Sequence, residues 1–243
     1  MERAIEERCY VCNCLLNKTS KTRDHVPAKN LFIKPHPEYP RHLITLPCCV
    51  TCNKKNRVYD EYFRVLVSMS HVRSEAAELV WSKVEATTLP SKRIQAHILD
   101  LIRTMKPIAH PEDGRQLFTS QSKAGKFKRY LKRMTLGLLA YHYPEISWNE
   151  RESFEWTIIQ IPPFKLQKFV TETEIMQSLQ YDCRGRLNEF RFWRGEMVDR
   201  PKHFVWLYIF LDSNPYLVIH TPRTKEIRKS ASVVPEWMKE PEY

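Results

Sequence analysis

The sequence contains no long run of apolar residues. The longest such stretch covers residues 204–211 of the 243, far short of the ~20 residues that a membrane-spanning helix needs. The chain also starts with the charged residues Glu2 and Arg3 and lacks the apolar core of a secretory signal there. These absences predict a protein without a membrane partner that stays in the cytoplasm.

Glycine is scarce, with 5 residues against 16 prolines, and the chain has neither an internal repeat nor a low-complexity tract. Apolar residues make up 42% of the chain and aromatic residues 12%. This composition fits an ordered globular protein better than a disordered one. Because domains usually contain ~100–150 residues, the length suits one large domain or two small ones.

Cysteine is almost missing from the last three quarters of the chain, where Cys183 is the only one. The other six lie together in the first quarter: Cys9, Cys12, Cys14, Cys48, Cys49 and Cys52. In a reducing cytosol, such a cluster indicates metal thiolates and not disulfides.

Two Cys-x-x-Cys pairs lie within this cluster, Cys9 with Cys12 and Cys49 with Cys52. Four thiolates in two such knuckles match the tetrahedral coordination that zinc prefers. We therefore predict a structural Zn²⁺ held by these four residues.

Two further cysteines complicate the assignment. Cys48 could replace Cys49 as a ligand, but only Cys49 leaves a two-residue gap before Cys52. Cys14 lies just beyond the first knuckle, where we interpret it as a spare thiol at the tip.

Polar residues occupy defined places around the two knuckles. Thr-Arg-Asp-His-Val-Pro covers residues 22–27, Asn53 follows the last knuckle cysteine, and Asp-Glu-Tyr-Phe-Arg covers residues 60–64. In this order, with an apolar strand between the knuckles, residues 9–64 resemble the HNH endonuclease family. The resemblance implies a ββα-metal nuclease module stapled by zinc.

The resemblance also implies roles for individual residues. Asp24 and Asn53 would be the protein ligands of a catalytic Mg²⁺ or Mn²⁺, hard cations that prefer oxygen donors. His25 would be the general base, which suits an imidazole that titrates near pH ~6.5. With only two protein ligands, the metal would keep positions for water and phosphate oxygens.

The sequence departs from the family pattern at two positions. The middle polar residue of the family, usually an asparagine before the second knuckle, is absent; His42 is the first candidate to replace it and Asn30 the second. The last family position, histidine in many members, is Asn53 here. This exchange changes the ligand but keeps an oxygen donor.

The net charge is +11, from 39 Lys and Arg against 28 Asp and Glu, which favours a polyanionic partner. Residues 114–144 contain no acidic residue, and within them Lys126, Arg129 and Arg133 share one face at helical spacing. We predict phosphate contacts by these three residues and by three residues that follow Asn53: Lys54, Lys55 and Arg57.

Beyond the knuckles, the periodicity predicts helices at about residues 59–89, 91–106 and 122–143. Aromatic and β-branched runs predict strands at residues 154–161, 190–193, 204–211 and 216–219. The expected fold class is α+β, with an HNH module in residues 1–70 and a helical and antiparallel-sheet region in residues 71–243. We interpret the latter as a substrate-binding or regulatory part.

The resulting hypothesis is a metal-dependent endonuclease that hydrolyses DNA, by default double-stranded, and leaves a 5′-phosphate and a 3′-hydroxyl as the resemblance implies. Stand-alone proteins of this type resemble restriction, phage-defence or mobile-element enzymes. Two alternatives stay open: a zinc-stabilised nucleic-acid-binding protein without activity, and an interaction protein whose basic face binds an acidic partner. A protein partner or a homodimer is compatible with each.

Overall fold

The computed structural model describes most of the chain. The described residues are 7–33, 43–69, 74–87, 91–109, 116–120, 124–162, 165–184 and 189–223. His42 and residues 110–115 lie outside them, so the prediction for His42 has no structural counterpart here.

The chain begins with a ββα unit. Strands β1 (Lys21–Val26) and β2 (Ile44–Cys49) pair antiparallel, and helix α1 (Val50–Ser68) follows β2 without a connecting loop. Asp24 and Val26 are buried on one face of β1, as the alternation of side chains along a strand requires. The short 3-10 helix η1 (Lys29–Leu31) packs against α1.

Helices make up most of the middle of the chain: α2 (Glu75–Thr87), α3 (Lys92–Arg103) and α4 (Ala124–His142). The single helix predicted for residues 59–89 is wrong, because α1 begins earlier and ends at Ser68. Strands β3 (Met105–Ala109) and β4 (Gln116–Ser120) form a hairpin that the sequence analysis did not predict.

The last part of the described chain forms a five-stranded antiparallel sheet in the order β5-β9-β8-β7-β6. The bounds are β5 Glu155–Gln160, β6 Gln180–Arg184, β7 Phe190–Met197, β8 Arg200–Phe210 and β9 Asn214–Thr221. Three short helices accompany them: α5 (Trp148–Ser153), α6 (Leu166–Glu172) and α7 (Glu174–Gln177). The predicted strands are confirmed, whereas β6 was missed.

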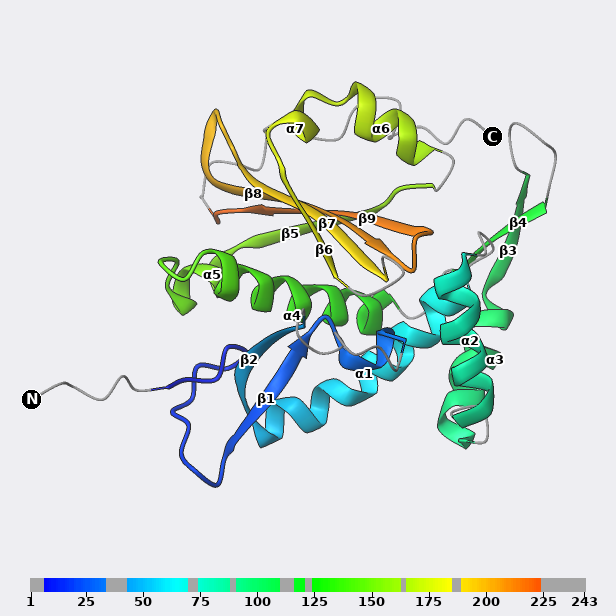
Figure 1. Cartoon of the computed structure of the whole chain (residues 1–243), viewed down its shortest axis with the longest axis horizontal. Coiled ribbons are helices and arrows are strands. Elements are labelled where there is room, and N and C mark those ends of the chain that lie inside the picture. The colour runs from blue at the N-terminus through cyan, green and yellow to red at the C-terminus, as the bar shows by residue number, and fades with distance from the viewer. Residues whose placement is uncertain are drawn as a thin grey trace, which may run out of the picture.

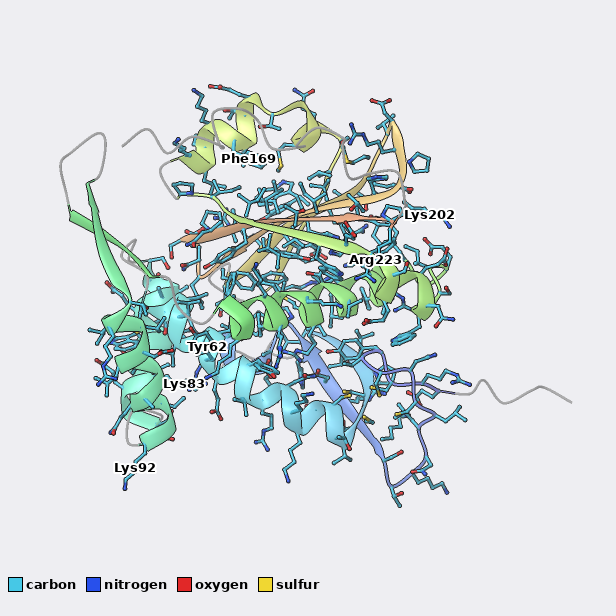
Figure 2. All side chains as sticks on the ribbon, turned by 180° about the vertical axis from the view of Figure 1, so that it is seen from behind. Tyr62, Lys83, Lys92, Phe169, Lys202 and Arg223 are labelled. Atoms are coloured by element: carbon cyan, nitrogen blue, oxygen red, sulfur yellow. The ribbon has the colours of Figure 1, made fainter. Side chains whose placement is uncertain are left out.

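The sheet is covered on both faces (Figure 1). Helices α6 and α7 lie over one face, where Phe169 packs into a small apolar cluster with Val205 and Leu207. Helix α4 crosses the other face, and the ββα unit lies beyond α4. Side chains fill the space between these layers (Figure 2).

Helix α4 is the layer shared by the sheet and the ββα unit. Gly137 lets it approach β1, since a Cβ at this position would lie 2.8 Å from Cγ2 of Val26. One continuous hydrophobic core extends from Tyr10 through Phe63 and α4 to Phe210 on β8. The predicted boundary near residue 70 is therefore crossed by a common core.

The predicted α+β class is confirmed, with an N-terminal β-hairpin, a helical middle and a C-terminal antiparallel sheet. In the described parts of the chain, no helix has both the length and the apolar character needed to cross a membrane.

Candidate metal centre

Four cysteines converge beside the β-hairpin. The sulfur atoms of Cys9, Cys12, Cys14 and Cys49 lie within 4.8 Å of one another. Four zinc–sulfur bonds of ~2.3 Å in a tetrahedron place the sulfurs ~3.8 Å apart, and the Sγ atoms of Cys12 and Cys49 are 3.8 Å apart. The group is therefore consistent with a structural zinc site.

Local backbone geometry explains how Cys14 joins this group. The loop that carries Cys9 and Cys12 folds back on itself, and the Cys9 N–H donates to the Cys14 carbonyl at 3.0 Å. Asn13 has a φ of 59° at the turn, a conformation that asparagine tolerates better than most residues. Cys14, which we had interpreted as a spare thiol, thus lies opposite Cys9.

The second knuckle is built by the start of α1. Cys49 is the N-cap of this helix, and its sulfur accepts a hydrogen bond from the Cys52 N–H at 3.3 Å. Cys52 is half-buried at the same helix end but is not among the four sulfurs that converge. Of the predicted ligand set, the structure brings Cys9, Cys12 and Cys49 together and adds Cys14.

Cys48 lies behind the group and supports it. Its thiol is fully buried, accepts a hydrogen bond from the Cys9 sulfur at 3.9 Å and donates to the Cys49 carbonyl at 3.5 Å. The contact with Cys48, against the effect of burial, lowers the pKa of Cys9 to about 4. A lowered pKa favours the thiolate, which is the form of cysteine that binds metals.

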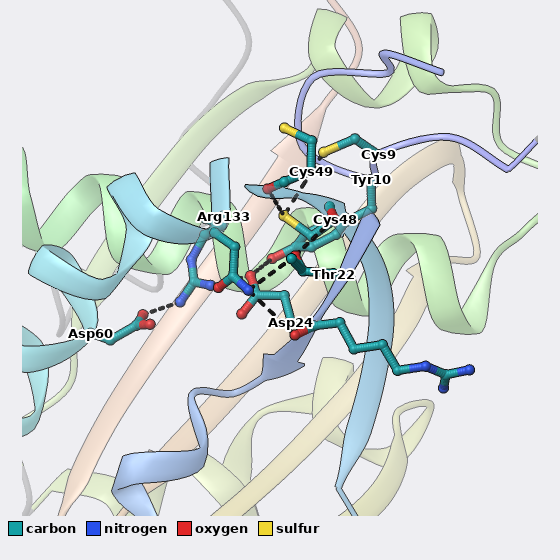
Figure 3. A network of polar contacts seen from close by, with 10 residues as sticks. Cys9, Tyr10, Thr22, Asp24, Cys48, Cys49, Asp60 and Arg133 are labelled. Carbon is teal, nitrogen blue, oxygen red and sulfur yellow. Dashed lines mark hydrogen bonds and ion pairs between the residues drawn. The ribbon is translucent and has the colours of Figure 1, made fainter. Parts of the chain in front are cut away.

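Asp24 takes part in a buried network of polar side chains (Figure 3). Its Oδ2 accepts a hydrogen bond from the Tyr10 hydroxyl at 2.7 Å and an ion-paired hydrogen bond from Nη1 of Arg133 at 2.6 Å. Nη2 of Arg133 is bonded to Oδ1 of Asp60 on α1. Burial raises the pKa of Asp60 to about 7, although the Arg133 charge opposes the shift.

His25 follows Asp24 on β1 and points to the other face of the hairpin, because side chains alternate along a strand. It is half-buried. Burial, assisted by the positive charge of Lys29, lowers the pKa of His25 below its ordinary value of 6.5. The imidazole is therefore neutral at physiological pH and can accept a proton.

Asn53 extends from the first turn of α1 onto β1. Its Nδ2 donates to the Thr22 hydroxyl at 3.1 Å and lies 3.4 Å from the Arg23 carbonyl. These two residues directly precede Asp24 and His25 on the strand. The structure thus brings Asn53 next to the Asp-His pair, with its amide nitrogen engaged by the strand.

The predicted basic stripe on α4 requires a correction. Lys126, Arg129 and Arg133 do share one helix face, but all three side chains contact residues of α1, and among them only Arg129 is exposed. The Lys126 ammonium lies 5.2 Å from the Tyr62 ring centre, and Arg129 donates to the Tyr59 hydroxyl at 2.9 Å. Arg133 is 5% exposed and ion-paired with two carboxylates, so it is not a surface phosphate ligand.

Several exposed cations surround the hairpin and the start of α1, among them Lys21, Arg23 and Lys29. Lys54, Lys55 and Arg57 are exposed on α1, and Arg129 is exposed at the edge of α4. Asn30, the second candidate for the missing family position, is half-buried, and its amide oxygen accepts no hydrogen bond from the described residues.

Tyr10, Asp60 and Arg133 were not predicted to form a network around Asp24. Tyr10 lies between two knuckle cysteines and Asp60 opens the acidic run at residues 60–64, so both had a local signal. Arg133 had none, because its partners are 109 and 73 residues away.

Comparison of the chain with protein-family models, with curated proteins and with solved structures gives no significant match. Functional inference therefore depends on the geometry of the site itself.

Proposed function

We propose that the protein is a zinc-stapled, metal-dependent endonuclease of the HNH type that hydrolyses DNA phosphodiester bonds. The observation that carries this proposal is the position of Asn53. Its amide reaches β1 directly beside the Asp24-His25 pair, and the cysteine group lies at the same helix end. Residues from two strands and one helix thus meet in a single small unit.

The oxygens of Asp24 and Asn53 suit Mg²⁺ or Mn²⁺ in their chemistry. The two donors to Asp24 both use Oδ2, so Oδ1 is the oxygen that we assign to the metal. When bound, such an ion would stabilise the charge that develops on the phosphate and the leaving oxygen.

His25 would remove the proton from the attacking water. Its lowered pKa keeps the imidazole neutral, as this role requires. Asp24 and His25 point to opposite faces of β1, and among the described residues β1 pairs with a strand on one edge only. In this proposal the phosphate would lie across the other edge.

The substrate is held by charge in this proposal. Lys54, Lys55 and Arg57 continue α1 from Asn53 and are exposed, so they can contact phosphates beside the cleaved bond. Such contacts position nucleic acid without reading its sequence. Double-stranded DNA is the substrate we assign, and restriction or phage defence is the biological setting we infer.

A second function, nucleic-acid binding without catalysis, is favoured by the state of Asp24. This carboxylate is only 4% exposed and already has a guanidinium partner. A structural role for Asp24 would satisfy these contacts without any catalytic metal, and the cysteine group would then serve the fold alone.

Plasmid cleavage separates the two functions. The zinc-loaded protein should nick or linearise supercoiled plasmid with Mg²⁺ or Mn²⁺, and His25→Ala should lower the rate by about 10²–10⁴-fold, the usual contribution of a general base. His203→Ala is the matched control, because His203 lies on β8 and its ring contacts the Pro201 carbonyl.

Zinc content is measured for each variant so that loss of folding is not mistaken for loss of catalysis. Equal cleavage by the wild type and His25→Ala would remove His25 from the mechanism. Salt-sensitive DNA binding without cleavage under any metal condition would instead establish the non-catalytic function.

A further inference from the structure

The network around Asp24 joins three segments that are distant in sequence. Asp24 lies on β1, Asp60 on α1 and Arg133 on α4, and the guanidinium of Arg133 bridges the two carboxylates. All three side chains are buried, with relative exposures of 4%, 8% and 5%. Solvent therefore does not compete for these contacts.

Burial makes such an arrangement costly unless every charge has a partner. Two carboxylates and one guanidinium removed from water lose their hydration, and ion pairing recovers this loss only with good geometry. An apolar triad would stabilise the core at least as well, so the ionic triad is a weak device for stability. Its other effect is geometric, since it fixes the orientation of Asp24.

The contacts determine how the Asp24 carboxylate is turned. Tyr10 and Arg133 approach the same oxygen, Oδ2, from the first knuckle and from α4. Two donors on one oxygen restrict rotation of the carboxylate and thereby fix the direction in which Oδ1 points. Asp60 in turn holds the guanidinium from the α1 side.

We infer that Arg133 is a positioning residue, which holds the Asp24 carboxylate so that Oδ1 faces the metal and the scissile phosphate. This inference rests on the proposed nuclease function. It also gives the region beyond residue 70 a share in the site, because α4 supplies the residue that orients a ligand on β1. Hydrogen-bond partners of metal ligands typically change metal affinity or activity by about 10–100-fold when they are replaced.

Manganese binding and plasmid cleavage by the zinc-loaded full chain test the inference. Arg133→Met should raise the Mn²⁺ dissociation constant, followed by the EPR signal of free Mn²⁺, by about 10–100-fold and lower kcat by a similar factor. Arg133→Lys should lie between it and the wild type, because an ammonium keeps the charge but cannot bridge both carboxylates as a planar fork does.

Lys132→Met is the matched control. It removes one positive charge from the neighbouring position of α4, where the ammonium pairs with Glu152 and lies over the Trp156 ring. It should bind Mn²⁺ and cleave DNA as the wild type does. Zinc content and thermal melting are measured in parallel, and Arg133→Lys carries the test if Arg133→Met does not fold.

The outcomes distinguish a failure of the positioning role of Arg133 from a failure of the proposed nuclease function. Wild-type or tighter Mn²⁺ binding by a folded Arg133→Met would show that the guanidinium does not orient the ligand, and would overturn the inference alone. A wild-type protein that binds no Mn²⁺ and cuts no DNA would remove the proposed function, and the positioning role with it.

Discussion

Phe63 is the side chain whose removal should show most clearly that the cysteine group and the sheet share one core. It is fully buried on α1. Its ring centre lies 3.8 Å from that of Tyr130 on α4 and 4.7 Å from that of Phe210 on β8. A third contact, to Phe127, spans 5.8 Å.

The size of the effect follows from these contacts. Truncation of a buried phenylalanine to alanine costs about 3–5 kcal/mol in transfer and cavity terms, and aromatic pairs contribute ~0.5–1.5 kcal/mol beyond their buried area. Because Phe63 has four aromatic neighbours, we expect Phe63→Ala to lie at the upper end of the truncation range and to lower the free energy of unfolding by about 4–5 kcal/mol. Domains are stable by only ~5–15 kcal/mol, so the urea concentration at the midpoint of unfolding should fall strongly.

Urea unfolding followed by two probes measures this effect. Tryptophan fluorescence reports on the sheet through Trp206, which is fully buried, and a chromogenic chelator reports zinc release. Both midpoints should fall together in Phe63→Ala. Leu99→Ala, at a site that is 51% exposed on α3, should change stability by less than about 0.5 kcal/mol. If only the fluorescence midpoint moved, the idea of a common core would be refuted.

Two further predictions concern the cysteines and a histidine. Cys12→Ser should lower the zinc content, whereas Cys183→Ser should leave it unchanged. The sulfur geometry also predicts that Cys14→Ser loses zinc and that Cys52→Ser keeps it. If Cys52→Ser lost zinc and Cys14→Ser kept it, the ligands would instead be those of the two Cys-x-x-Cys knuckles. Burial, assisted by Arg194, lowers the pKa of His142 from 6.5 to about 4, so the unfolded chain binds a proton below pH 6.5 that the folded protein accepts only near pH 4. The free energy of unfolding should therefore fall as the pH decreases from 6.5 towards 4. Denaturant titrations should show that this fall is shallower in His142→Gln than in the wild type. An equally steep fall in both proteins would contradict the lowered pKa of His142.

Local patterns were sufficient for the elements whose side chains alternate or repeat regularly. The runs at residues 204–211 and 216–219 consist of β-branched, aromatic and other apolar residues, and they form most of the central strand β8 and of its neighbour β9. Both strands are buried on both sides because helices cover each face of the sheet. The three cysteines that the structure confirms were found from spacing alone.

The features that could not be predicted depend on contacts between residues that are distant in sequence. The spacing of Lys126, Arg129 and Arg133 indicated correctly that they share a helix face, but a charged face is usually solvated. Arg133 is instead buried, because it pairs with Asp24 and Asp60, and neither of these residues is near it in the chain. Cys14 joined the cysteine group for a similar reason, because a turn and not a spacing rule brings it opposite Cys9.

Tyr10 gives the knuckle loop a second consequence. It directly follows Cys9, and its hydroxyl reaches the Asp24 carboxylate across the hairpin. We therefore expect a change in how the first knuckle is held, such as chelation or oxidation of its sulfurs, to displace this hydroxyl from the Asp24 carboxylate.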